Sequence, residues 1–195
     1  MSRIVAITNL SLDGVMQAPG RPDEDRRDGF AHGGWAAPYA AMQHIGGNMS
    51  SAAALLFGRR TYEDFRSVWP HRKDNPFTAV LNNMHKYVAS ATLHEPLPWV
   101  NSTLLPGDAA AAMASLRKQP GNDIVILGSG ELIRSLMRRA LIDEFLLLIH
   151  PLVLGSGRQL FTQENGFATL RLVASQTTDR GVVIATYQPA PSTTG

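Results

Sequence analysis

The sequence predicts one α/β domain with a mostly parallel sheet that finishes in an antiparallel hairpin. Short apolar runs rich in β-branched residues alternate with helix-like segments along residues 3–150, an order typical of βαβ units. Two of these runs end at glycine directly before a helix, and the last two flank Asp179-Arg180-Gly181 as a hairpin. No solenoid repeat or interdomain linker is apparent, so we expect one domain over residues 1–188 and a disordered tail over residues 189–195.

The first expected strand, residues 3–8, is followed by a long polar and glycine-rich segment that reaches Trp35. Loops of this length are usually functional or disordered. We expect a helix over residues 36–45, stopped by Gly46-Gly47. The other expected strands are residues 52–57, 86–90, 100–105, 123–127, 144–150, 170–177 and 182–188. The other expected helices begin at Thr61, at residue 109 after the N-cap Asp108, and at residue 131.

Composition excludes several classes of function. A chain of 195 residues with 44% hydrophobic and 17% charged residues can bury a core, and no apolar run reaches the roughly 18 residues of a membrane helix. The net charge of +2 is too small to favour nucleic acid. Cysteine is absent and the six histidines lack metal-ligand spacing, so we expect no disulfide and no metal site. Without a visible signal peptide, we expect a cytoplasmic protein.

Two strand-to-helix junctions are candidate phosphate sites. Gly58-Arg59-Arg60-Thr61 follows one apolar strand, and Gly128-Ser129-Gly130-Glu131-Leu132 follows another. Glycine lets the backbone approach a ligand closely, and a helix N-terminus offers unpaired N–H groups to an anion. In a parallel sheet both junctions lie at the carboxyl edge, where ligands bind. The pair indicates a ligand with two phosphate groups, such as a dinucleotide; alternatively, the glycines only make tight turns and the arginines face solvent.

Standard nucleotide motifs do not settle this choice. Ile133 stands where the G-x-G-x-x-G pattern needs its third glycine, so the Rossmann fingerprint is incomplete. The phosphate loop G-x-x-x-x-G-K-[ST] and the nucleophile elbow G-x-S-x-G are both missing. Spacing alone therefore leaves the two interpretations open.

A string of short motifs resembles a known family. In order, the motifs are Ser11-Leu12-Asp13-Gly14, Gly58-Arg59-Arg60-Thr61-Tyr62, Lys86-Tyr87-Val88-Ala89-Ser90, Trp99 with Asn101-Ser102-Thr103, Gly128-Ser129-Gly130-Glu131-Leu132, Ile142-Asp143-Glu144 and Gly155-Ser156-Gly157. Over residues 3–187 the chain resembles the three-layer dihydrofolate-reductase-like fold. It is most similar to the reductase (C-terminal) domain of the bifunctional riboflavin-biosynthesis deaminase-reductase and to the stand-alone relatives of that domain.

The resemblance implies an NADPH-dependent reductase of a small heterocyclic or carbonyl substrate, similar to 5-amino-6-(5-phosphoribosylamino)uracil reductase and dihydrofolate reductase. It places the adenosine 2′-phosphate at Gly58, Arg59, Arg60 and Thr61. It places the adenine ribose near Ser90 and the pyrophosphate at Gly128, Ser129, Gly130, Glu131 and Leu132. It places the nicotinamide under the first loop, at Leu12, Asp13 and Gly14. Arginine at the first junction favours NADPH, because a 2′-phosphate suits a bidentate cation.

The chain also departs from its relatives. These 195 residues contain no cysteine for a zinc deaminase signature, so we expect no deaminase function, and the expected helix at residues 36–45 carries no carboxylate where the resemblance to dihydrofolate reductases implies one. Asp13 is the remaining candidate catalytic residue, although Asp-Gly pairs commonly form turns. Trp35 and Tyr39 are candidate walls of the substrate pocket, and the alternative for Trp35 is to anchor the long loop. The source of the proton stays open.

A second hypothesis is a non-catalytic NADPH-binding module of the same fold. The missing helix carboxylate is consistent with this hypothesis. Family members are often dimers, so we also expect a homodimer, with the apolar segment 146–154 as an interface strand. The run of acidic and arginine residues at 21–28 is expected to be a solvated loop face or a lid.

Overall fold

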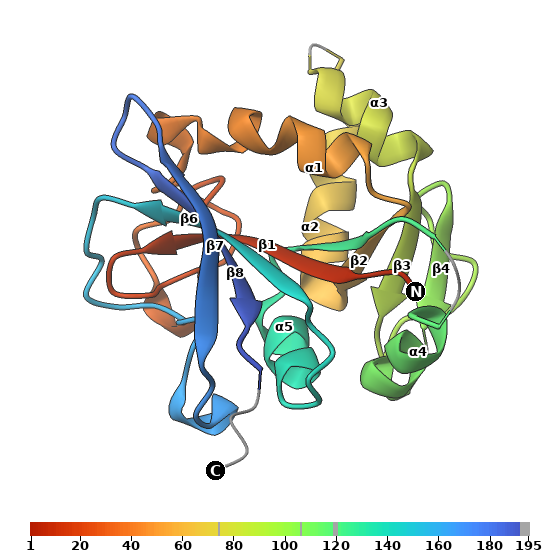
Figure 1. The fold of residues 1–195 in the computed structure, drawn as a ribbon. Helices are drawn as coiled ribbons and strands as arrows, with labels where there is room; N and C mark the ends of the chain where they lie inside the picture. Colours follow the sequence, from red (N-terminus) through yellow and green to blue (C-terminus); the bar gives the residue numbers. More distant parts are fainter. Residues whose placement is uncertain (74, 106, 119–120, 192–195) are drawn as a thin grey trace.

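The computed structural model describes residues 1–73, 75–105, 107–118 and 121–191, and its strands form one eight-stranded sheet (Figure 1). The strands are β1 (Ile4–Ser11), β2 (Ala54–Gly58), β3 (His85–Ala89), β4 (Ser102–Leu105), β5 (Ile124–Leu127), β6 (Glu144–His150), β7 (Leu170–Thr177) and β8 (Val183–Pro189). The α-helices are α1 (Gly46–Ser50), α2 (Arg59–Val68), α3 (Pro76–Asn83), α4 (Ala109–Leu116) and α5 (Gly130–Met137). Short 3-10 helices occur at Arg27–Gly29, Ala37–Tyr39, Ala41–Ile45, Trp69–His71 and Gln163–Asn165.

The sheet order is β4-β3-β2-β5-β1-β6-β8-β7. All pairs from β4 to β6 are parallel, whereas β8 runs antiparallel to both β6 and β7. The predicted parallel sheet with an antiparallel end is therefore confirmed. The prediction of an interface strand at residues 146–154 is wrong for its strand part: β6 pairs with β1 on one side and β8 on the other, so it has no free edge.

Helices cover both faces of the sheet (Figure 1). Alternate residues of β1 serve the two faces, because successive side chains of a strand point in opposite directions. Val5 and Ile7 join the core cluster that includes residues of α1, α2 and α3. Ile4 and Ala6 join the cluster that includes residues of α4 and α5. Both clusters hold fully buried side chains, so the strand ends are fixed on a rigid support.

The segment predicted as one helix, residues 36–45, is two 3-10 turns. Ala40 between them has a left-handed backbone (φ +52°), a conformation that an α-helix cannot contain. Gly46 and Gly47, predicted to stop a helix, begin α1 instead. The helix α3 was not predicted. Its C-terminus is closed by the fully buried Lys86, whose Nζ donates to three backbone carbonyls, at Leu81 (2.7 Å), Asn82 (3.3 Å) and Met84 (2.7 Å).

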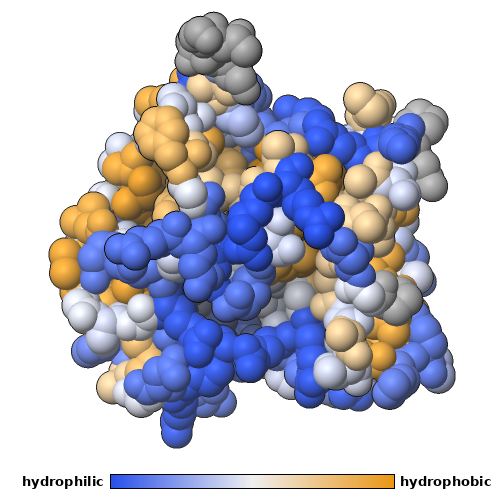
Figure 2. All heavy atoms as spheres, turned by 90° about the horizontal axis from the view of Figure 1, so that it is seen from below, coloured by the Kyte–Doolittle hydropathy of each residue, from blue (hydrophilic) through white to orange (hydrophobic). Residues whose placement is uncertain are grey.

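Among the described residues, no helix has both the length and the apolar character needed to cross a membrane. Seen from below the view of Figure 1, hydrophilic side chains gather around a hollow in the surface (Figure 2). Pro189 of the expected tail belongs to β8. Residues 192–195 of that tail lie outside the part of the chain that the structure describes.

Candidate active site

A cavity of about 700 Å³ lies at the carboxyl ends of the parallel strands. Its lining includes Asn9 of β1, Gly58 of β2, Ala89 of β3 and Leu127 of β5. Open α/β sheets bind ligands at this edge, where loops and helix N-termini converge. The cavity therefore brings together the two glycine junctions that the sequence singled out.

Ser129 ties these junctions together. Its Oγ accepts a hydrogen bond from the Gly58 N–H (2.9 Å) and donates one to Thr61 Oγ1 (2.9 Å). A Cβ added at Gly58 would lie 3.4 Å from the same Oγ, so the junctions are in close contact. The N-termini of α2 and α5 consequently flank one cavity and present their unpaired N–H groups to it.

The turn after β5 has an unusual backbone. Gly128 and Ser129 both have a positive φ (+59° and +62°), which is common for glycine and infrequent for serine. A Cβ at Gly130 would lie 2.4 Å from the Met16 Sδ of the long loop, so a side chain here would displace the end of the Met16 side chain. The backbone here is exposed to the cavity in the way that an approaching phosphate requires.

Ten of the twelve predicted cofactor-binding residues line this cavity: Gly58, Arg59, Arg60, Thr61, Ser90, Gly128, Ser129, Gly130, Glu131 and Leu132. Arg59 is held in place, since its guanidinium donates to Glu63 Oε1 (2.9 Å) and Thr92 Oγ1 (2.6 Å). Arg60 is exposed. Ser90 Oγ accepts from the N–H groups of Thr92 and Leu93, so it shapes the turn after β3.

Leu12, Asp13 and Gly14 are not among the residues that line the cavity. The Asp13 carboxylate accepts hydrogen bonds from Ser11 Oγ (2.6 Å), Leu154 N–H (3.1 Å) and Gly155 N–H (2.8 Å). These bonds, the Ser11 hydroxyl first, lower the pKa of the Asp13 carboxyl. Asp13 thus fastens the first loop to the segment after β6. The geometry gives its catalytic role no support and fits the turn alternative.

The expected pocket walls Trp35 and Tyr39 also lie outside the cavity lining. Trp35 anchors the loop by donating its Nε1–H to the Gln17 carbonyl (2.7 Å). Both rings pack edge-on against His150, at centroid distances of 5.2 and 5.1 Å. His150 is fully buried, and its Nε2 lies 2.9 Å from Asn9 Oδ1. The aromatic pair therefore supports the cavity wall indirectly, through His150 and Asn9.

Burial lowers the pKa of His150 to about 4, so the ring is neutral at ordinary pH. Because Asn9 Oδ1 faces Nε2, the ring carries its proton on Nε2 and donates it. Nδ1 is buried without a hydrogen-bond partner among the described residues. The bond fixes the Asn9 amide at the edge of the cavity.

The long loop crosses the cavity and is tied to both sides of it. Arg21 forms a two-point ion pair with Asp64 of α2 (2.5 and 3.2 Å). On the other side, Arg158 contacts Asp28 through two nitrogens (3.1 and 2.8 Å). Sequence reasoning missed these partners because they are 43 and 130 residues apart. The run of acidic and arginine residues at 21–28 was the only sign of these ion pairs in the sequence. The two ion pairs fit the alternative in which this segment is a lid.

Several other lining residues were also not predicted. Ile7, Met16, Met42 and Phe65 give the cavity an apolar portion, and Glu24, Arg27, Arg134 and Arg158 add charge. Arg134 donates to the Gln159 carbonyl (2.8 Å) and to Glu131 (2.5 Å). The structure shows no group of three or more metal-ligating side chains in the described ranges.

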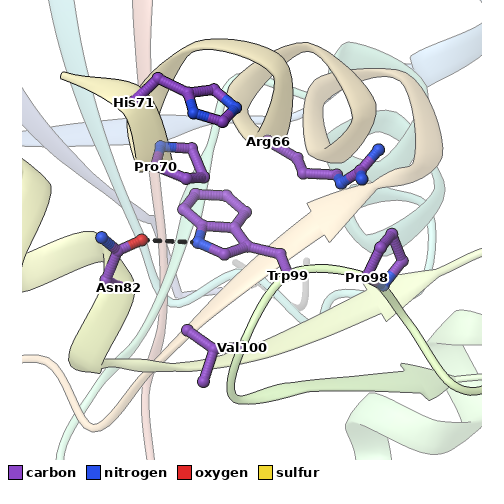
Figure 3. Close-up of a pocket in the computed structure, with 7 residues that line it drawn as sticks. All are labelled: Arg66, Pro70, His71, Asn82, Pro98, Trp99 and Val100. Carbon is purple, nitrogen blue, oxygen red and sulfur yellow. Dashed lines mark hydrogen bonds between the residues drawn. The ribbon is translucent and has the colours of Figure 1, made fainter.

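A second cavity of about 320 Å³ lies on the α2–α3 side of the sheet (Figure 3). Trp99 forms its wall and donates its Nε1–H to Asn82 Oδ1 (2.7 Å). Pro70, Pro98 and Val100 supply apolar surface around that ring. None of the candidate residues from the sequence lines this cavity, so the site at the strand ends is the one that the sequence analysis indicates.

Comparisons with known proteins agree with this architecture. The uncharacterized protein YyaP of Bacillus subtilis (strain 168) is 31% identical over 140 residues, 68% of this chain and 72% of that protein. A solved structure from Shewanella sp. PV-4, named as a candidate riboflavin biosynthesis protein, has a TM-score of 0.70 at 20% identity, covering 97% and 99% of the two chains. Dihydrofolate reductase of Enterococcus faecalis, solved with NADP(H), has a TM-score of 0.59 at 14% identity, covering 97% of each chain.

These likenesses confirm the predicted dihydrofolate-reductase-like fold. The family described as the RibD C-terminal domain matches residues 3–184, nearly the whole length of the chain. The chain belongs to the RibD C-terminal domain family.

Proposed function

We propose that this protein is an NADPH-dependent oxidoreductase that reduces a small heterocyclic or carbonyl compound. The observation that carries the proposal is the pair of helix N-termini joined by Ser129 on one cavity. Two adjacent anion-binding helix ends suit the separated phosphates of a dinucleotide. The family and the fold support a reductase, and the related dihydrofolate reductase of E. faecalis was solved with NADP(H).

The residues present fit such a cofactor. Ser129 and Gly130 would hold the pyrophosphate through backbone N–H groups, and Gly128, which has no side chain, would let it approach the turn. The Ser129 hydroxyl is directed to Gly58 and Thr61. Arg59 and Arg60 would bind the 2′-phosphate. When bound, NADPH supplies the hydride that the reaction consumes.

The protein's own part is to position the acceptor and exclude water. Ile7, Met42, Phe65 and Leu127 offer apolar surface to a flat ring, beside the fixed amide of Asn9. The Arg21–Asp64 ion pair draws the loop across the cavity. A small, planar, partly polar acceptor fits this combination best.

The test is a screen of heterocyclic and carbonyl acceptors with NADPH, followed by absorbance of the reduced cofactor. Oxidation that depends on both enzyme and acceptor would support the reductase. NADPH binding without turnover on any acceptor would favour the alternative, a binding module of the same fold. The matched control for substitutions of Arg59 or Arg60 is Arg171→Ala, because Arg171 lies on the edge strand β7 and contacts Gln188.

We also propose a homodimer. Its support is the edge strand β7, where Leu172 and Val173, at the register shift of the strand, are 51% and 45% exposed. Phe167, just before β7, is 97% exposed. Exposed apolar surface of this kind often marks an interface. Sedimentation equilibrium would show twice the chain mass, and a monomer at all concentrations would refute the dimer.

A further inference from the structure

Six carboxylates line the cavity at the strand ends: Glu24, Asp25, Glu63, Asp64, Asp108 and Glu131. Five of them form ion pairs with arginine, and the pairs are Asp25–Arg27, Glu63–Arg59, Asp64–Arg21, Asp108–Arg139, and Glu131 with both Arg134 and Arg158. Each of these five carboxylates therefore has at least one guanidinium as its partner.

Glu24 differs from the other five. No arginine, lysine or histidine among the described residues forms an ion pair with it. Its Oε2 accepts hydrogen bonds from the backbone N–H groups of Gly20 (2.7 Å) and Arg21 (3.1 Å), which leaves Oε1 for another partner. The neighbouring Arg21 guanidinium is directed to Asp64 instead (2.5 Å).

The surroundings of Glu24 favour the protonated form. Burial raises the pKa of its carboxyl, and the negative charge of Asp64 on α2 adds to that rise. The N–H groups of Gly20 and Arg21 and the more distant charge of Arg21 oppose it, with burial the largest effect. A carboxyl group with a raised pKa inside a reaction cavity is suited to general acid catalysis.

We propose that Glu24 is the proton donor of the reductase, supplied by the long loop in place of a carboxylate on the segment 36–45. This proposal rests on the proposed function. In the reaction, the hydride of NADPH bonds to the carbon of a C=N or C=O group. The π bond of that group breaks, and its nitrogen or oxygen takes the proton of Glu24. Glu24 becomes a carboxylate, NADPH becomes NADP⁺, and water returns the proton to Glu24.

Glu24 and the Arg21 side chain that pairs with Asp64 belong to the same loop. The loop that carries Glu24 is the one that Arg21 fastens to Asp64 across the cavity. One loop therefore both positions the acid in the cavity and covers the cavity.

The first test needs no substrate. The chain contains six glutamates, so the side-chain carboxyl carbons of ¹³C-glutamate-labelled protein can be titrated by NMR, with Glu24→Gln assigning one resonance. We expect Glu24 to titrate above the ordinary glutamate pKa of about 4.3. The matched control is Glu164→Gln, a substitution at an exposed position that should leave the Glu24 resonance unchanged. A Glu24 resonance that titrates at or below the ordinary glutamate pKa would overturn the proposal.

The second test separates this proposal from the function on which it rests. NADPH affinity should be equal in the wild-type protein and Glu24→Gln, while turnover of an acceptor falls about 100- to 10,000-fold, the usual worth of a general acid. The wild-type rate should fall as pH rises through the Glu24 pKa, and the variant should lack that decline. Retained turnover in Glu24→Gln, with NADPH still bound, would overturn the acid role alone. Absence of NADPH binding in both proteins would overturn both proposals.

Discussion

His150 should make the fold sensitive to mild acid. The ring is fully buried and its pKa is lowered to about 4, against about 6.5 for an exposed histidine. The unfolded chain therefore takes up a proton near pH 6.5, whereas the folded protein takes it up only near pH 4. Stability is then fully present above pH 6.5 and is lost as pH falls through this interval.

The expected magnitude follows from the same two values. Each pH unit across the interval costs about 1.4 kcal/mol, which gives a total of about 3.5 kcal/mol and about 2 kcal/mol between pH 7 and pH 5. The lower range is best avoided, because aspartates and glutamates begin to titrate there. Urea unfolding at pH 7, 6 and 5 measures this part of the curve.

The matched variant is His150→Gln, which keeps a hydrogen-bond donor for Asn9 Oδ1 but cannot be protonated. We expect it to be less stable than the wild type at pH 7, because the ring contacts with Trp35 and Tyr39 are lost. Its stability should change about 2 kcal/mol less than that of the wild type between pH 7 and pH 5. Parallel losses in the two proteins would refute the reasoning.

Two further substitutions test the supports of the site and the fold. Ser129→Ala leaves the Gly58 N–H without its acceptor and removes the bond to Thr61. We therefore expect the free energy of unfolding in urea to fall by about 1–3 kcal/mol and NADPH to bind more weakly. Unchanged binding would show that the two junctions act separately. Lys86→Met removes three hydrogen bonds at the end of α3 and the cation 4.7 Å from the Trp99 ring. We expect a loss of about 1–3 kcal/mol, because the carbonyls lose their donor, without a change in NADPH affinity. Equal stability would contradict the capping role.

The sequence predicted the parts of the site that depend on local order. Glycine after a buried strand and before a helix indicates a phosphate-binding turn, and the parallel sheet then brings Gly58 and Gly128 to the same edge. Each strand that takes part in this sheet is a short apolar run, and each run can be recognised in the sequence by itself. The Ser129 bridge between the two turns adds a contact that no local pattern predicts.

The predictions that the structure does not support concern features that depend on contacts between distant segments. The left-handed backbone at Ala40 breaks the expected helix and is not visible in a helix-like composition. Asp13 stands in a motif that fits both a catalytic acid and a turn, and only the bonds to Leu154 and Gly155 distinguish the two. Glu24 lies in a run of mixed charges, and the sequence does not show that it lacks an arginine partner, because this depends on the contact of Arg21 with Asp64.

The proposed function requires that the two junctions bind the phosphates of NADPH. Isothermal titration calorimetry of the purified protein with NADPH and with NADH measures this binding, and it is repeated with Arg59→Ala, Arg60→Ala and the control Arg171→Ala. We predict binding of NADPH at least about tenfold tighter than NADH, since a bidentate arginine–phosphate contact is worth roughly 1.5–3 kcal/mol. The preference should shrink in the Arg59 and Arg60 variants and persist in the control. Equal affinity for the two cofactors, or binding of neither, would contradict the claim.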